Sequence, residues 1–194
     1  MWQMKKLGSP KFTKIIIVVL LALFVISFYY FEPSTTLRIL VILFGLIGLW
    51  QLVKSPEIAS VLILYLAVYA FYNLHYGLSV PLAFLLVGLF ALSIFLFFAQ
   101  ANLDNSKNLL EKSIFNIFAW IMGFSVLEFF LALDFLPINP LAKALAVTVS
   151  FYLFEKIFYL YANNVLNFRR TLGYIVATLV VFGLIIILNL KFGF

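Results

Sequence analysis

The sequence predicts an all-α membrane protein, a bundle of seven transmembrane helices that forms a single domain over residues 1–194. Hydrophobic residues make up 66% of the chain and charged residues 10%, against about 25% charged residues in a typical soluble domain. The apolar residues fall into seven stretches, and no segment between them is long enough to fold by itself. A soluble domain of this length leaves much of its surface exposed to water, so lipid is the solvent that suits this composition.

The seven stretches have the length of membrane-spanning helices. A hydrocarbon core of about 30 Å requires roughly 17–25 helical residues. Strands are not expected, because no segment alternates with period two and open sheet edges cannot face lipid. The expected transmembrane helices cover residues 15–31, 37–53, 58–74, 80–99, 114–133, 141–162 and 172–188.

Polar or turn-forming residues separate these stretches. The first one follows a basic segment, as in a signal sequence, but it leads into Tyr29-Tyr30-Phe31-Glu32-Pro33, which is a poor cleavage site. We therefore expect it to remain as an uncleaved anchor. The later boundaries contain polar or turn-forming residues and lie, in chain order, at residues 32–34, 54–57, 75–79, 100–113, 134–140 and 163–171.

The positions of lysine and arginine predict the orientation, because cytoplasmic loops of membrane proteins carry an excess of both residues. With the N-terminus in the cytoplasm, nine of them lie on the cytoplasmic side, and two, Arg38 and Lys191, lie outside. The C-terminus is then outside. Lysine outnumbers arginine ten to three, a bias typical of AT-rich genomes, which favours a prokaryotic plasma membrane. The nine are Lys5, Lys6, Lys11, Lys14, Lys54, Lys107, Lys112, Arg169 and Arg170.

The sixth stretch carries a polar stripe. At 100° per residue, its members fall within one arc of roughly 100°. Lipid offers such a stripe no hydrogen bonds, so it is expected to face other helices or water. It is either a pathway for a proton, an ion or a small solute past Glu155, or a packed seam that holds this helix in the bundle. The stripe consists of Thr148, Tyr152, Glu155, Lys156 and Tyr159.

Two further ionisable residues lie near one another in depth. Glu128 is in the outer half of the fifth stretch, and Lys143 is near the outer end of the sixth. The short turn between these stretches makes the two helices antiparallel neighbours, so a buried Glu128–Lys143 ion pair is predicted. The alternatives are that Lys143 extends toward the headgroups, or that the two residues belong to a substrate site.

The third stretch carries four tyrosines at i, i+4, i+7 and i+11, which places them along one helix face. They could form a hydrogen-bond ladder, a surface for a quinone or a lipid headgroup, or the wall of a polar pathway. More often, such rings pack between helices while each hydroxyl donates to a backbone carbonyl. If the third and sixth stretches were in contact, tyrosines of both would surround Glu155. The stripe comprises Tyr65, Tyr69, Tyr72 and Tyr76.

Small residues at helical spacing predict close contacts between helices, notably Gly45 with Gly48 and Gly173 with Ala177.

The chain contains no cysteine, which excludes disulfides, thiolate catalysis and iron–sulfur clusters. Its one histidine, His75, lies in a turn without the partners of a metal site. No metal or other cofactor is therefore expected. Nucleic acid is not an expected partner either, because the basic residues are scattered between apolar stretches.

Three classes of function remain. The first expectation is a non-enzymatic scaffold or assembly subunit, with the lipid bilayer, other membrane subunits or a second copy as partners. The second is a small translocator that uses the polar face of the sixth helix. The third is an enzyme on a lipid-linked substrate, with Glu128, His75 and Asp134 as its polar groups. The signatures of retinal proteins, rhomboid-like and paired-glutamate proteases and phospholipid-headgroup transferases are missing from the sequence.

Overall fold

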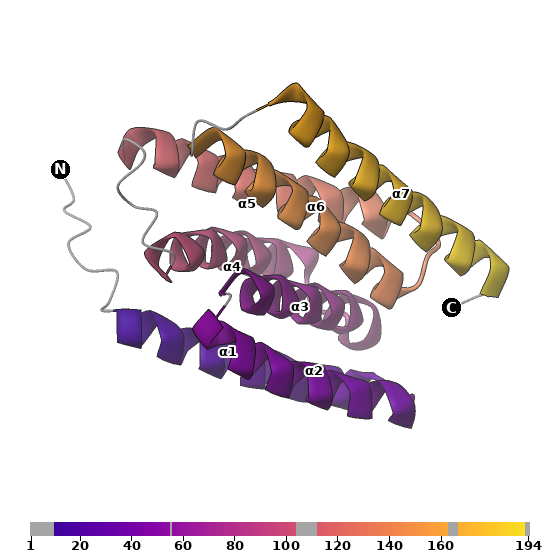
Figure 1. The fold of residues 1–194 in the computed structure, drawn as a ribbon. Coiled ribbons are helices and arrows are strands. Elements are labelled where there is room, and N and C mark those ends of the chain that lie inside the picture. Colours follow the sequence, from indigo (N-terminus) through magenta and orange to yellow (C-terminus); the bar gives the residue numbers. More distant parts are fainter. Residues whose placement is uncertain (1–9, 55, 104–111, 163–166, 193–194) are drawn as a thin grey trace.

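The computed structural model describes residues 10–54, 56–103, 112–162 and 167–192, and these residues form seven α-helices (Figure 1). Successive helices run in alternating directions. The predicted all-α class is confirmed. The helices are α1 (Pro10–Phe31), α2 (Thr35–Lys54), α3 (Pro56–Leu78), α4 (Leu82–Leu103), α5 (Lys112–Asp134), α6 (Pro140–Ala162) and α7 (Phe168–Phe192).

Five of these helices are long and apolar enough to cross a membrane, which supports the prediction of a membrane protein. Their apolar segments are Lys11–Phe31, Glu57–Leu78, Leu82–Gln100, Ile114–Asp134 and Phe168–Ile185. The other two differ for separate reasons. The apolar part of α2, Thr35–Trp50, is shorter, and α6 carries Lys143, Glu155 and Lys156 among its 23 residues.

The helices extend past the predicted apolar stretches, because a helix requires backbone hydrogen bonds rather than an apolar surface. Proline is the first residue of α1, α3 and α6, where its missing N–H removes no helical hydrogen bond. The side chain of Asn139 caps α6 by accepting from the Leu141 N–H at 2.7 Å. Helix α3 ends at Leu78, before Ser79, which has a left-handed φ of 54°.

The helices form layers around α3. In Figure 1, α1 and α2 form one side of the bundle, α3 and α4 the middle, α5 and α6 the next layer, and α7 lies on the outside beside α6. Helix α3 packs against α1, α2, α4 and α6. It is the most deeply buried of the five apolar helices, and α7 is the least. The position of α3 means that its side chains can bridge several helices.

Glycines allow close packing at some of the predicted places. A Cβ at Gly48 would lie 2.8 Å from Leu62 Cδ2, so this glycine is a site of close approach between α2 and α3. The tightest position, Gly123 in α5, was not predicted, and there a Cβ would lie 2.6 Å from Phe90 Cε2 of α4. At Gly173 a Cβ would meet nothing within 4 Å. This glycine therefore borders open space, contrary to the prediction of close packing.

Candidate functional site

The polar contacts between the central helices concentrate where α3 packs against α6. The late part of α6 contacts the start of α3, through Lys156 and Glu57, and the early part of α6 contacts the end of α3, through Lys143 and Tyr76. The two helices are therefore antiparallel. We call these two contacts, together with Asp134, the α3–α6 seam, and refer to its Glu57 end and its Tyr76 end.

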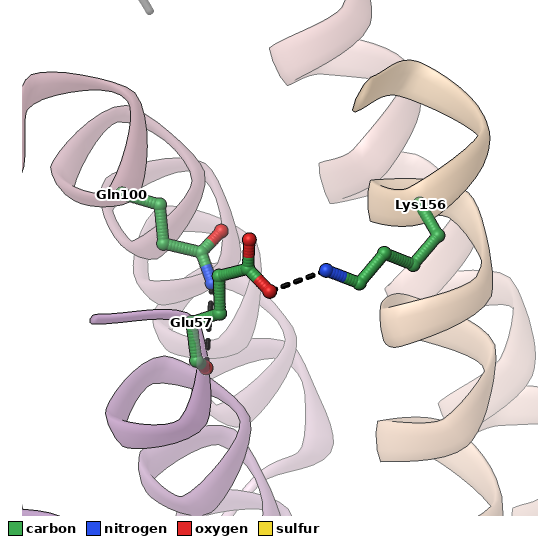
Figure 2. Close-up of polar contacts among 3 residues, drawn as sticks. All are labelled: Glu57, Gln100 and Lys156. Carbon is green, nitrogen blue, oxygen red and sulfur yellow. Dashed lines mark hydrogen bonds and ion pairs between the residues drawn. The ribbon is translucent and has the colours of Figure 1, made fainter. Parts of the chain in front are cut away.

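At the Glu57 end, a lysine of α6 reaches across to a carboxylate of α3 (Figure 2). The Lys156 Nζ donates to Glu57 Oε2, and the two side chains are 15% and 28% exposed. Gln100 of α4 donates from Nε2 to the Glu57 backbone carbonyl at 3.5 Å. Glu57 lies in the first turn of α3, where a negative charge also interacts favourably with the helix dipole. This end of the seam thus joins three helices through one residue.

At the Tyr76 end, three residues from three helices share one network. The Tyr76 hydroxyl donates to Asp134 Oδ1 at 2.5 Å. The Lys143 Nζ donates to the Tyr76 hydroxyl oxygen at 3.0 Å and to the Asp134 backbone carbonyl at 3.1 Å. Asp134 is the last residue of α5, whose carbonyl would otherwise lack a helical partner. The lysine therefore satisfies the end of α5 and joins it to α3.

Tyrosine rings surround both lysines. Lys143 Nζ lies 5.2 Å from the ring centroid of Tyr72 and 5.0 Å from that of Tyr76. Lys156 Nζ lies 5.1 Å from the ring of Tyr152 and 5.8 Å from that of Tyr159. Ring faces attract cations at these distances, and the attraction is stronger where water is excluded. The rings thus help to hold each ammonium group in place.

The tyrosines of the α3 stripe contact different parts of the bundle. The buried Tyr72 donates to the Phe130 carbonyl of α5 at 2.7 Å, and its ring stacks on that of Phe130 at 4.1 Å. Tyr69 donates to Glu32 Oε2 at 2.9 Å. Tyr65 is partly buried against the core. This pattern is the one expected of packed rings whose hydroxyls have found acceptors on neighbouring segments.

The polar stripe of α6 does not face the bundle as a unit. Thr148 and Glu155 are buried, and the Thr148 hydroxyl donates to the Ala144 carbonyl at 2.8 Å within the same helix. Tyr152 and Tyr159 are exposed, at 39% and 46%. An arc of 100° is wide enough to extend over the edge of a buried face. One side of the arc therefore faces other helices, and the other side is exposed.

The structure does not bring Glu128 and Lys143 together. Glu128 is exposed on α5, whereas the Lys143 ammonium group binds Tyr76 and the Asp134 carbonyl. Among the residues that the structure describes, the one ion pair joins Lys156 to Glu57. A similar depth in two neighbouring helices does not determine which way each side chain leaves its helix.

In the described part of the chain, no hydrogen bond joins Glu128, His75 and Asp134, the residues proposed for an enzyme, to one another. His75 was expected in a turn between helices but lies in the last turn of α3, where its Nδ1 is 3.2 Å from the Val80 carbonyl oxygen. Asp134 is bound to Tyr76, and no hydrogen bond joins either residue to Glu128. The described residues also contain no group of three or more His, Asp or Glu side chains placed to hold a metal ion.

Sequence reasoning missed two acidic residues of the site, Glu57 and Glu32, because both were treated as loop boundaries. Glu32 is 4% exposed, and its carboxylate accepts from Tyr69 and from the Ser34 N–H. A usable signal did exist for Glu57. A lysine near the end of a span can extend toward the membrane surface, and an acidic residue in the first turn of another helix at that surface is a natural partner for Lys156.

Comparison of the chain with protein-family models, with curated proteins and with solved structures finds no match.

Proposed function

We propose that this chain is a seven-span protein of a prokaryotic plasma membrane that acts as a non-enzymatic scaffold or assembly subunit. The observation that carries the proposal is that the polar side chains of the α3–α6 seam bind one another across helices. Lys156, Lys143 and Tyr76 each bind a group of another helix. Polar residues inside a membrane protein either serve a substrate or join helices, and these residues join helices.

The proposed topology places the N-terminus in the cytoplasm and the C-terminus outside. The alternating directions of the helices (Figure 1) suit seven crossings, and the distribution of lysine and arginine supports this orientation. Three of the residues that carry this bias, Lys5, Lys6 and Lys107, lie outside the described residues. Reporter fusions after residues 34, 79, 137 and 194 should report the outside, and fusions after residues 55, 107 and 165 the inside. A reversal at any one loop would contradict the topology.

The apolar faces of the outer helices are the surfaces on which such a subunit would assemble. Helix α2 exposes Ile42 and Leu46, and α7 exposes Val176 and Val180. In a bilayer, either lipid or another apolar helix can cover these side chains. The hydrophobic effect favours neither, because lipid tails are as apolar as the side chains. Partners are therefore expected to be other membrane helices, including those of a second copy.

A cross-linking experiment tests the assembly role. Photoreactive residues at Val176 and Ile42 should give discrete adducts with protein in cells, and native mass spectrometry of the gently extracted complex should show the same species at a fixed stoichiometry. Leu64 of the buried core is the matched control position, from which no adduct with another chain is expected. Lipid adducts alone at Val176 and Ile42, together with a monomer in native mass spectrometry, would overturn the proposal.

The burial of Glu155 at 6% exposure makes a translocator the second candidate. Proteoliposomes with a pH-sensitive dye separate the two. The scaffold proposal expects the wild-type protein to conduct protons no faster than empty liposomes do. A translocator would show flux that Glu155→Gln abolishes and that Glu128→Gln, which removes the exposed carboxylate of α5, leaves unchanged.

A further inference from the structure

A groove lies between α6 and α7, at the Glu57 end of the bundle. Its volume is about 890 Å³, within the range of roughly 300–1,000 Å³ that ligand sites in proteins have. Helix α7 packs at the edge of the bundle beside α6 (Figure 1), so the groove opens along the outer surface. Its lining includes Lys156, Tyr159, Arg170, Gly173, Tyr174 and Ala177.

The lining of this groove is basic. It contains two cations, Lys156 and Arg170, and no acidic residue is among the described residues that line it. Glu57 engages one of the three N–H donors of the Lys156 ammonium group. Arg170 is exposed and has no ion pair within the described part of the chain. An arginine guanidinium presents five donors in a fork that matches phosphate oxygens. The groove therefore suits a phosphate-bearing anion.

The lining also changes from charged to apolar with depth along α7. Arg170 is in the first turn of the helix, and Ala177 lies about 10 Å further along it at 1.5 Å per residue. Gly173 and Tyr174 lie between them, and a Cβ at Gly173 would meet nothing within 4 Å. A groove that is cationic at the start of α7 and lined by small residues further along it has the polarity of one phospholipid molecule, with its phosphate at the helix end and its acyl chain beside Gly173 and Ala177.

We propose that this groove is a binding site for an anionic phospholipid, with Arg170 and Lys156 holding the phosphate and Gly173 and Ala177 leaving room for an acyl chain. The proposal rests on the membrane placement of the helices but not on the scaffold role. Basic pockets between transmembrane helices at a membrane surface are a recurrent form of headgroup site. The source of the phosphate is a lipid of the leaflet at the Glu57 end rather than a soluble anion, because the groove continues into the apolar region.

Native mass spectrometry of the full-length protein with equimolar phosphatidylglycerol and phosphatidylcholine tests the site. Arg170→Gln is expected to reduce retained phosphatidylglycerol about fivefold, which is the effect of one basic residue near a membrane surface. Gly173→Leu fills the groove and should reduce binding of either lipid there. The matched controls are Arg169→Gln, a neighbouring cation outside the lining, and Gly183→Leu, a glycine of the same helix that also has open space around it.

The outcomes are distinct. The proposal is supported if phosphatidylglycerol is retained in preference to phosphatidylcholine and if Arg170→Gln and Gly173→Leu, but neither control, remove that preference. Equal losses from Arg169→Gln and Arg170→Gln would show diffuse charge attraction and overturn the site. If inorganic phosphate displaced the lipid at millimolar concentration, a soluble anion would be the ligand and the lipid assignment would fail. None of these results bears on the cross-linking or the flux measurements, so failure of the site leaves the scaffold proposal testable.

Discussion

Substituting alanine for Gly123 should destabilise the protein, although alanine favours helix formation. A Cβ at this position would lie 2.6 Å from Phe90 Cε2, 2.8 Å from Phe90 Cδ2 and 3.0 Å from Ile94 Cγ1. Ordinary contacts of this kind are about 3.5–4.0 Å. The Phe90 ring would therefore have to move by about 1 Å. Its neighbours restrict that movement, because its centroid is 5.4 Å from that of Trp120 and 5.1 Å from that of Phe124.

The expected magnitude follows from two opposing contributions. Overpacking a closely packed contact costs about 1–3 kcal/mol, and replacing glycine by alanine in a helix recovers up to about 1 kcal/mol. The free energy of unfolding of Gly123→Ala should therefore fall by about 1–2 kcal/mol. Gly183→Ala in α7 is the matched control, since its Cβ would meet nothing within 4 Å. The control should be neutral or more stable than the wild-type protein.

Unfolding by SDS in mixed micelles, followed by circular dichroism, measures both variants against the wild-type protein. A second measurement isolates the contact itself. Phe90→Leu removes the ring that the new methyl group would meet, so Gly123→Ala should cost less in that background, with a coupling energy of about 1 kcal/mol. If Gly123→Ala proved as stable as Gly183→Ala, or if Phe90→Leu gave no rescue, the close approach of α4 and α5 at this glycine would be refuted.

Three further outcomes follow from the polar contacts and the backbone. A double-mutant cycle of Lys156→Met and Glu57→Gln should give a coupling of about 1 kcal/mol, because the pair is partly exposed; additive effects would show no interaction. Tyr72→Phe should lower the free energy of unfolding by about 1 kcal/mol by removing a buried hydrogen bond to the Phe130 carbonyl, whereas Tyr30→Phe, at 75% exposure, should be silent. Ser79→Gly should stabilise the protein by about 1 kcal/mol, since glycine adopts its left-handed φ without a Cβ penalty; an unchanged melting temperature would contradict this.

The positions of the helices could be predicted because a lipid environment limits the backbone structures that a segment can adopt. A span must satisfy its backbone internally, so each long apolar stretch has to be a helix, and proline marks several of the starts. The predicted ends of the helices were less accurate. The third helix was expected to end at residue 74 and continues to Leu78, because the polar residues Asn73, His75 and Tyr76 do not interrupt backbone hydrogen bonds.

The contacts of the seam were less predictable, because they join residues distant in sequence. Lys156 and Glu57 are 99 residues apart, and Tyr76 and Lys143 are 67 apart. A helical wheel gives the spacing of polar residues but not the rotation of the helix in the bundle. That rotation decides which of the polar residues face a neighbouring helix. By contrast, the prediction that tyrosine hydroxyls would find backbone carbonyls required no packing order, and Tyr72 illustrates it.

The two lysines of α6 bind α3 at opposite ends of the seam. Lys143 and Lys156 are 13 residues apart, or about 20 Å along the helix, which is less than the hydrocarbon thickness of about 30 Å. Lys143 binds Tyr76 at one end of the seam, and Lys156 binds Glu57 at the other. Sliding α6 by one turn, about 5.4 Å, would displace both lysines from their partners on α3. The two contacts together therefore fix the register of α6 against α3.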